Sequence, residues 1–118
     1  MTAEIILVET SITRSRLREI ASWRMGDLVK AVVDIEKGIM AVGGELHADE
    51  EAFLIERECS QDNLWGINIY PDLPEDKMLE FDSVINIRPR QDNRSRSVEN
   101  EKIKTAIREV VNKLIQGD

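Results

Sequence analysis

Six polar residues in the second half of the chain have the side-chain types that hold a negatively charged ligand. They are Asn68, Asn86, Arg88, Asn93, Arg94 and Ser95. Arginine presents a planar fork of donors that matches a carboxylate or a phosphate, and asparagine and serine can complete such a shell. The first three are expected on the polar faces of neighbouring strands, and the other three in the loop that follows. If this loop ends at the start of the last helix, the free backbone amides there add further attraction for an anion. The sequence therefore indicates an anion pocket here.

A plainer interpretation of the same residues is open as well. The stretch from Arg90 to Glu99 is a polar loop, and its arginines can simply neutralise Asp92, Glu99 and the acidic first turn of the following helix. Charge runs are more often solvated surface than ligand sites. The anion pocket is the hypothesis to test, and the solvated loop is the alternative that the pattern favours.

Asp34 and His47 are the candidates for moving a proton. Asp34 lies among Val32, Val33 and Ile35, where an unpaired carboxylate is costly, so it could be a general base with a raised pKa. The alternative, which we favour, is an aspartate near a turn that is solvated or paired with Lys30, because strand ends are usually wet. His47 is the sole histidine, and its imidazole is the side chain that titrates naturally near neutral pH.

A metal site at His47 is also considered, because acidic residues surround it. Glu45, Asp49, Glu50 and Glu51 are the carboxylates that could join it around a divalent ion. The spacing matches no established ligand pattern, and a solvated or capping histidine beside a helix start explains it better. We therefore predict no metal site.

Other catalytic and cofactor motifs are missing from the sequence. Ser83 and Ser95 lack a glycine-framed nucleophile turn, Gly43-Gly44 lacks the lysine and spacing of a nucleotide loop, and Cys59 has no partner for a disulfide. The sequence predicts no cofactor and favours a non-catalytic binding or regulatory module. The alternative is a small enzyme or binding protein for an anionic or phosphorylated small molecule.

Length and charge narrow the class of protein. The 118 residues suit one domain, spanning 1–118, and no apolar run is long enough to cross a bilayer, so we expect no membrane association and a cytoplasmic location. The net charge of −7 repels phosphate backbones and disfavours nucleic-acid binding, despite arginine clusters near residues 14–24 and 88–96.

The segment from Asp27 to His47 must supply the centre of the fold. It predicts a hairpin of strands Leu28–Ile35 and Ile39–Gly43, joined by Glu36-Lys37-Gly38, with Ile35 opposite Ile39 and Val33 opposite Ala41. One face is then apolar, carrying Val29, Ala31, Val33, Ile35, Ile39 and Ala41. The other face carries Val32, Met40 and Val42 beside Lys30 and Asp34, and we expect it to form a homodimer surface if no helix covers it.

The remaining elements follow from periodicity and capping residues. We expect an edge strand over Glu4–Val8, a helix from Arg14 to Trp23 capped by Thr13, and a helix within Glu45–Glu58 with Asp49 as its cap, a strand being the alternative. Strands are predicted over Leu64–Tyr70 and Leu79–Arg88. Asn100 caps an amphipathic C-terminal helix with its apolar stripe on Ile103, Ile107, Val110, Val111, Leu114 and Ile115. This order predicts an α+β domain, with a mostly antiparallel sheet of four to five strands and two or three helices.

Three segments of the chain resemble a small family of uncharacterised bacterial proteins, a domain of unknown function. They read LVKAVVDIEKGIMAVGGELHADEEA, QDNLWGINIYP and SVINIRPRQDNRS, and the likeness runs from about Leu17 through the final helix. The resemblance implies a compact single-domain bacterial protein and carries no catalytic role onto any residue. The chain departs from the family pattern at Glu58-Cys59, where the pattern has Gly-Ser.

Overall fold

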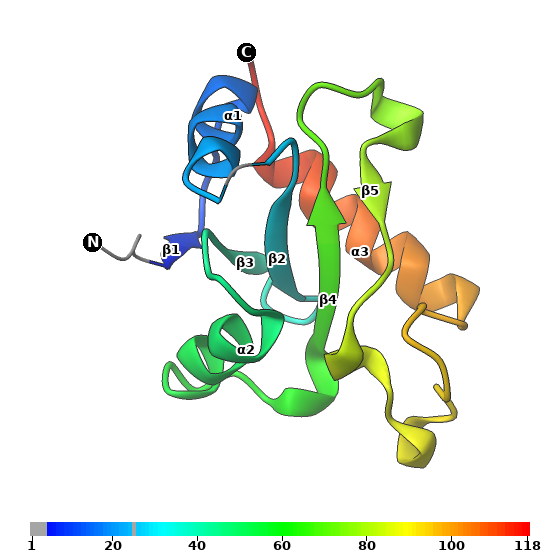
Figure 1. Cartoon of the computed structure of the whole chain (residues 1–118). Coiled ribbons are helices and arrows are strands. Elements are labelled where there is room, and N and C mark those ends of the chain that lie inside the picture. Colours follow the sequence, from blue (N-terminus) through cyan, green and yellow to red (C-terminus); the bar gives the residue numbers. More distant parts are fainter. Residues whose placement is uncertain (1–4, 25) are drawn as a thin grey trace.

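The protein is an α+β domain in which helices cover both faces of one antiparallel sheet (Figure 1). The computed structural model describes residues 5–24 and 26–118. Its five strands are β1 (Ile6–Val8), β2 (Val29–Asp34), β3 (Ile39–Val42), β4 (Leu64–Ile69) and β5 (Leu79–Glu80), in the spatial order β1-β3-β2-β4-β5. The helices are α1 (Arg14–Ser22), α2 (His47–Ile55) and α3 (Glu101–Leu114). The predicted fold class is confirmed.

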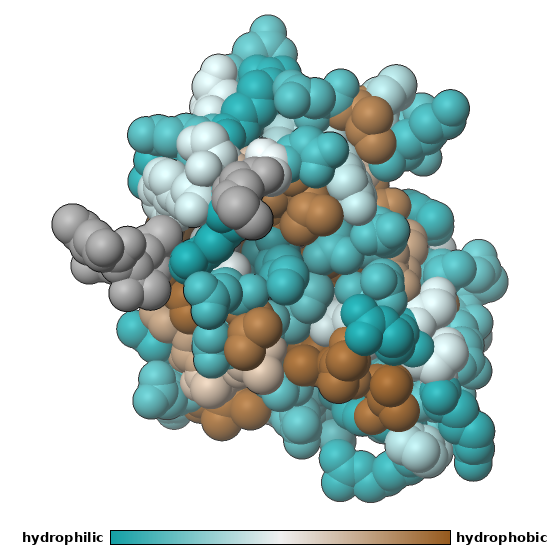
Figure 2. Space-filling view, viewed as in Figure 1, coloured by the Kyte–Doolittle hydropathy of each residue, from teal (hydrophilic) through white to brown (hydrophobic). Residues whose placement is uncertain are grey.

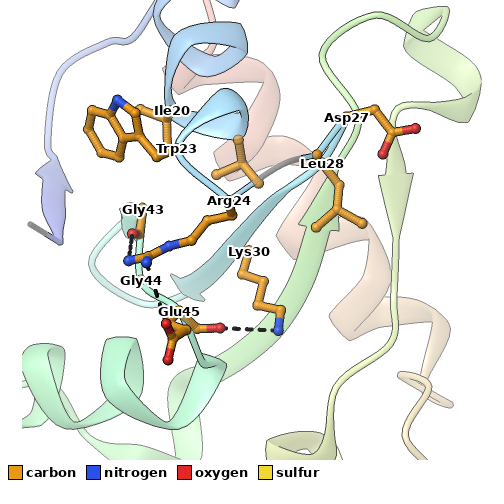
Figure 3. A pocket seen from close by; sticks show the side chains of 11 residues that line it. Ile20, Trp23, Arg24, Asp27, Leu28, Lys30, Gly43, Gly44 and Glu45 are labelled. Carbon is orange, nitrogen blue, oxygen red and sulfur yellow. Dashed lines mark hydrogen bonds and ion pairs between the residues drawn. The ribbon is translucent and has the colours of Figure 1, made fainter. Parts of the chain in front are cut away.

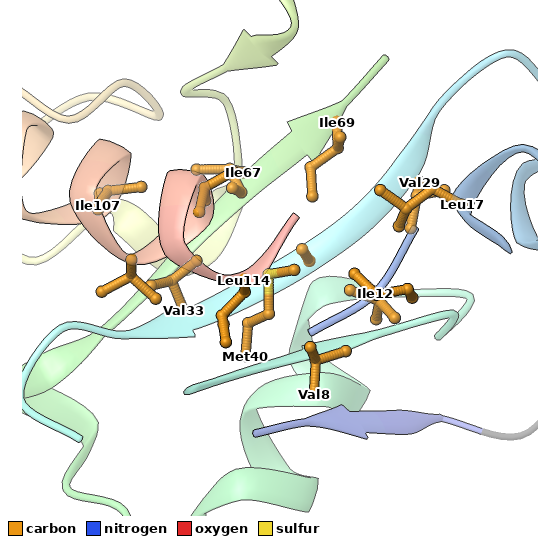
Figure 4. Packing of buried hydrophobic residues seen from close by; sticks show 14 of the residues in the cluster. Val8, Ile12, Leu17, Val29, Val33, Met40, Ile67, Ile69, Ile107 and Leu114 are labelled. Carbon is orange, nitrogen blue, oxygen red and sulfur yellow. The ribbon is translucent and has the colours of Figure 1, made fainter. Parts of the chain in front are cut away.

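Two apolar clusters hold the layers together, one on each face of the sheet. Helices α1 and α3 pack on the larger one, which contains Leu17, Trp65, Ile67, Ile107 and Leu114, all fully buried (Figure 4). Helix α2 covers the other face through Leu54, which packs with Val32, Ala41, Leu64 and Cys59. Each face therefore has its own core, and β2 contributes side chains to both.

The capping residues explain where two of the helices begin. Thr13 accepts a hydrogen bond from the Arg16 amide at 3.0 Å, and Asn100 accepts from the amides of Lys102 and Ile103, as predicted. The predicted helix within Glu45–Glu58 is also confirmed, but Asp49 is not its cap. The helix starts three residues earlier than that cap implies, with Leu46 at the N-cap position and no side-chain cap, so Asp49 falls in the first turn. Its charge is favourable there because the amide dipoles point towards it.

The hairpin register differs from the predicted one by a single residue. Asp34 pairs with Ile39 and Val33 with Met40, so the connecting loop is Ile35–Gly38 rather than Glu36–Gly38. The Asp34 side chain ends the strand, because its Oδ1 accepts from the amides of Glu36 and Lys37, both at 2.9 Å. Gly38 completes the turn with a φ of +70°.

This slip moves the side chains of the second strand to the opposite faces. Met40 and Val42 join Val33 under α1 and α3, whereas Ala41 lies with Val32 under α2. Val32, Met40 and Val42 are all fully buried, so the face that was expected to form a homodimer is covered within the chain. Homodimerisation stays a prediction that needs a different surface.

The predicted strand over Leu79–Arg88 is wrong beyond its first two residues. β5 ends at Glu80, and Val84–Asn86 form a turn of 3-10 helix in which the Ser83 hydroxyl accepts from the Ile85 amide. Asn86 and Arg88 are buried whereas Ile87 between them is 43% exposed, so a strand with Ile87 on its apolar face is not formed. The side chain of Asn86 bonds to β4 where a strand backbone would otherwise do so, as described below.

Glu58, at the turn after α2, has a φ of +70°, a backbone conformation that favours glycine. We expect Glu58→Gly to raise the free energy of unfolding by about 0.5–1 kcal/mol, because the strain of an L-residue is removed. Urea denaturation measures the change.

Glu56→Gly, at a position with φ −61°, is the matched control and should lower the free energy of unfolding instead. A lower free energy of unfolding in both variants would contradict backbone strain at Glu58.

Candidate functional site

Asn86 and Asn93, two of the residues expected in an anion pocket, lie together as parts of an internal hydrogen-bond network. Oδ1 of Asn86 accepts from the Gly66 amide at 2.8 Å, and its Nδ2 donates to the carbonyls of Gly66 and Arg96. Asn93 donates from Nδ2 to the carbonyls of Asn86, Ser95 and Ser97, and accepts from the Glu99 amide. Both side chains are almost fully buried. Their polar atoms tie the 82–99 segment to β4.

Arg88 joins this network as a buried cation. Its guanidinium donates to the carbonyls of Gln61 and Leu64 and stacks on the Trp65 ring, with its central carbon 4.1 Å from the ring centre. Burial lowers the pKa of Arg88 from its ordinary value. Two carbonyls and an aromatic face thus occupy most of the surface that this side chain could offer to a ligand.

The loop at Arg94 and Ser95 does bind a carboxylate, and the carboxylate belongs to the chain. Oε2 of Glu99 accepts from the Arg94 amide at 2.9 Å, the Ser95 amide at 2.8 Å and the Ser95 hydroxyl at 2.8 Å. These bonds, with the Ser95 hydroxyl foremost, hold the pKa of Glu99 below its ordinary value. Asn68 lies apart, where its Nδ2 donates to Oε1 of Glu80 and to the Asp82 carbonyl.

Asp34 is fully buried at the end of β2, where its Oδ1 caps the hairpin turn. It is neither solvated nor paired with Lys30, whose ammonium donates instead to the Glu45 carbonyl at 3.1 Å. Cys59 lies beside the aspartate, and burial, followed by contact with Asp34, raises the pKa of its thiol to about 11. A thiol with so high a pKa is a poor nucleophile at neutral pH.

His47, at the start of α2, donates from Nε2 to the Ile67 carbonyl at 2.8 Å. Burial is the main reason that its pKa lies below the ordinary value. Asp34 pairs with Leu64, the first residue of β4, whereas His47 bonds to Ile67, three residues further along that strand. Asp34 and His47, the two candidates for proton transfer, therefore do not meet. In residues 5–24 and 26–118, no group of three histidine, cysteine or acidic side chains could share a metal ion, and no helix is long and apolar enough to cross a membrane.

A hollow lies elsewhere, between the end of α1, the start of β2 and the segment after β3 (Figure 3). Its volume is about 550 Å³, within the range of small-molecule sites. In the described chain its apolar lining comes from Ile20, Trp23, Leu28 and Val29, and its charged lining from Arg24, Asp27, Lys30 and Glu45. None of the eight residues singled out from the sequence lines this cavity.

Two cations face this cavity, and both keep donors to spare. Arg24 donates from one terminal nitrogen to the Gly43 carbonyl at 3.2 Å, and its other terminal nitrogen lies 3.5 Å from a carboxylate oxygen of Glu45. Lys30 has three N–H donors, and the carbonyl of Glu45 occupies one of them. No carboxylate forms an ion pair with Lys30 in the described chain. Figure 3 shows both side chains converging on Glu45.

Glu50 supports the wall of the cavity from behind. Its Oε2 accepts from the Gly44 amide at 2.9 Å, and a side chain at Gly44 would meet Cγ of Glu50 at 2.7 Å. Glu50 is fully buried, and its other oxygen, Oε1, has no hydrogen-bond partner in the described structure. Desolvation therefore raises the pKa of this carboxyl well above its ordinary value.

Figure 2 shows several apolar groups among hydrophilic ones on one face of the molecule. The most exposed large apolar side chains are Val84, Leu46, Ile55 and Ile87. They come from α2 or its N-cap and from the turn after β5. The cavity at Arg24 and Lys30 is the stronger candidate site because it combines apolar walls with two cations.

Comparison with known proteins places the chain by sequence only. A family model described as a protein of unknown function (DUF5674) matches residues 6–114. No curated protein and no solved structure matches the chain.

Proposed function

The chain belongs to the DUF5674 family, whose function is not established, and we propose from its geometry that it is a non-catalytic module that binds a small anionic molecule. The ligand would occupy the cavity between α1, the start of β2 and the segment Gly43–Glu45. Arg24 and Lys30 would hold the negative charge.

The spare donors of Lys30 carry this proposal. An ammonium group that lines a cavity and has no carboxylate partner attracts an anion, because charge-assisted hydrogen bonds are stronger than neutral ones. Arg24 adds a second cation on the same wall, held by the Gly43 carbonyl. The Glu45 carboxylate approaches Arg24 only to 3.5 Å. An anion placed between Arg24 and Lys30 could approach both cations more closely.

The placement of the proton-transfer candidates supports a binding role over a catalytic one. Asp34 is engaged in the hairpin turn, His47 bonds to β4, and the Cys59 thiol has a raised pKa. None of the three is among the residues that line the cavity. A ligand held there would meet cations, carboxylates and apolar walls rather than an activated nucleophile or base.

Calorimetric titration with phenylacetate, a simple organic anion, tests this proposal. We expect binding to the unmodified protein and a loss of affinity of about tenfold or more in Lys30→Ala, since hydrogen bonds to charged groups contribute about 1.5–3 kcal/mol. Lys102→Ala, which removes an exposed lysine from α3, is the matched control for net charge and should bind as before.

The variant Arg94→Ala examines the loop site that the sequence indicates. It changes the exposed arginine of that loop and leaves the cavity intact. Unchanged affinity in Arg94→Ala, with loss in Lys30→Ala, supports the cavity. Equal affinity in all three variants and the unmodified protein, or loss in Arg94→Ala alone, would contradict it.

A further inference from the structure

The charges around the cavity limit the charge of its ligand. Arg24 and Lys30 contribute two positive charges, but Asp27 and Glu45 line the same space with two negative ones. A dianion such as a phosphate monoester would bring two charges against both carboxylates, and like charges at short range are repelled. The attraction to the two cations also doubles for a dianion, so attraction and repulsion offset each other in this lining of zero net charge. The cost of taking the ligand out of water rises faster than its charge, and this cost favours a monoanion.

One of the two cations can accept a carboxylate without loss of a strong contact. The Arg24–Glu45 pair is long, at 3.5 Å, and the Glu45 side chain is 69% exposed. An exposed pair of this kind contributes little to stability, so a ligand carboxylate can replace it at small cost. The flat fork of Arg24 matches the two oxygens of a carboxylate.

The remaining walls require an apolar body. Ile20 and Val29 line the space and are buried. Trp23 and Leu28 also line it, and Figure 3 shows them on either side of Ile20. Trp23 is 37% exposed, so part of its apolar surface remains for a ligand to cover. Covering such apolar surface stabilises a complex by about 25 cal/mol for each Å² removed from water.

We propose that the ligand is a monocarboxylate with an aromatic or branched aliphatic body, its carboxylate on Arg24 and Lys30 and its body against Trp23 and Leu28. This inference rests on the proposed function and adds the chemical class of the ligand. It excludes phosphate esters and small hydrophilic acids as the preferred ligands.

Titration calorimetry with four matched probes tests the class. Phenylacetate carries both parts, phenylacetamide keeps the body without the charge, acetate keeps the charge without the body, and phenyl phosphate replaces the monoanion with a mostly dianionic group. We expect phenylacetate to bind best, with each of the other three at least about tenfold weaker, the size of one lost charge-assisted bond or about 60 Å² of apolar contact.

Two variants separate the parts of the site. Trp23→Ala should weaken phenylacetate binding and leave acetate binding unchanged, whereas Lys30→Ala should weaken both. Leu28→Ala repeats the first test at a second wall residue, and circular dichroism confirms that each variant is folded. These paired readouts are specific to the cavity, because a general loss of structure would weaken both acids in all variants.

The outcomes distinguish this inference from the proposed function. Tighter binding of phenyl phosphate than of phenylacetate, lost in Lys30→Ala, would overturn the carboxylate class and leave the anion site in place. Equal affinity for acetate and phenylacetate would overturn the apolar body. Failure of every anion to bind the unmodified protein would overturn the proposed function itself.

Discussion

Asn86→Ala is expected to lower the free energy of unfolding by about 3 kcal/mol, since buried polar groups left without partners cost about 1–3 kcal/mol each. The variant removes the bonds of this side chain to the amide and carbonyl of Gly66 and to the Arg96 carbonyl. Gly66 is buried inside β4, and Ser83 packs so closely on it that a side chain there would meet Cβ of Ser83 at 2.6 Å. Urea denaturation followed by circular dichroism measures the loss as a lower midpoint.

Asn112→Ala is the matched control for this prediction. Asn112 lies on the exposed side of α3, and its replacement should change stability by less than about 0.5 kcal/mol. Equal urea midpoints for Asn86→Ala and Asn112→Ala would contradict this prediction. They would show that the hydrogen bonds of Asn86 to the Gly66 backbone do not stabilise the edge of β4 as a paired strand would.

Glu50 should make the stability of the protein depend on pH. Its folded-state pKa is raised, so the folded chain binds a proton that the unfolded chain releases. Stability from this group is therefore complete below the ordinary glutamate pKa, about 4.3, and is lost as the pH rises from there through the raised folded value. Within that window the loss is at most about 1.4 kcal/mol for each pH unit.

The variant Glu50→Gln isolates this effect. Glutamine keeps an oxygen that can accept from the Gly44 amide and cannot ionise. We expect similar stability for the two proteins near pH 4.5 and a growing advantage for Glu50→Gln as the pH rises towards 8, measured by urea denaturation at each pH. Glu109→Gln on the exposed side of α3 should show no such divergence. Parallel pH profiles for Glu50→Gln and the unmodified protein would contradict the buried neutral carboxyl.

Strong local signals predicted much of this fold. The stripe from Ile103 to Ile115 and the Asn100 cap define α3, because helical periodicity over four turns and a capping side chain are both local in sequence. The alternation of Trp65, Ile67 and Ile69 likewise predicts β4, and in the structure this strand is buried on both faces. The structure of these elements is determined by residues close together in the sequence, so it can be predicted from the sequence.

The parts that failed depend on a single side chain or on distant segments. The hairpin register follows from the Asp34 carboxylate, which accepts two amides and shortens β2 by one residue. The end of β5 follows from Asn86, which bonds to Gly66 twenty residues away. No periodicity in the sequence reports either contact.

The candidate site was missed for a related reason. The cavity joins residues 20–24 to residues 43–45, segments that are far apart in the sequence and meet only in the folded chain, where Arg24 contacts Gly43 and Glu45. Glu50 stands in a run of acidic residues that reads as solvated surface, and only its contact with Gly44 reveals that it is buried. The glycine pair was the one sequence signal here, since Gly44 has to be small for Glu50 to approach it.

Chemical-shift mapping of amide and indole N–H signals during titration with phenylacetate tests the anion site most directly. We expect saturable shifts at the amides of Gly43 and Gly44 and at the indole of Trp23, all of which lie at the cavity. The amides of Arg94 and Ser95, which Glu99 already occupies, should not move. Shifts centred on Arg94 and Ser95, or no shifts at the cavity with the ligand in large excess, would contradict the site.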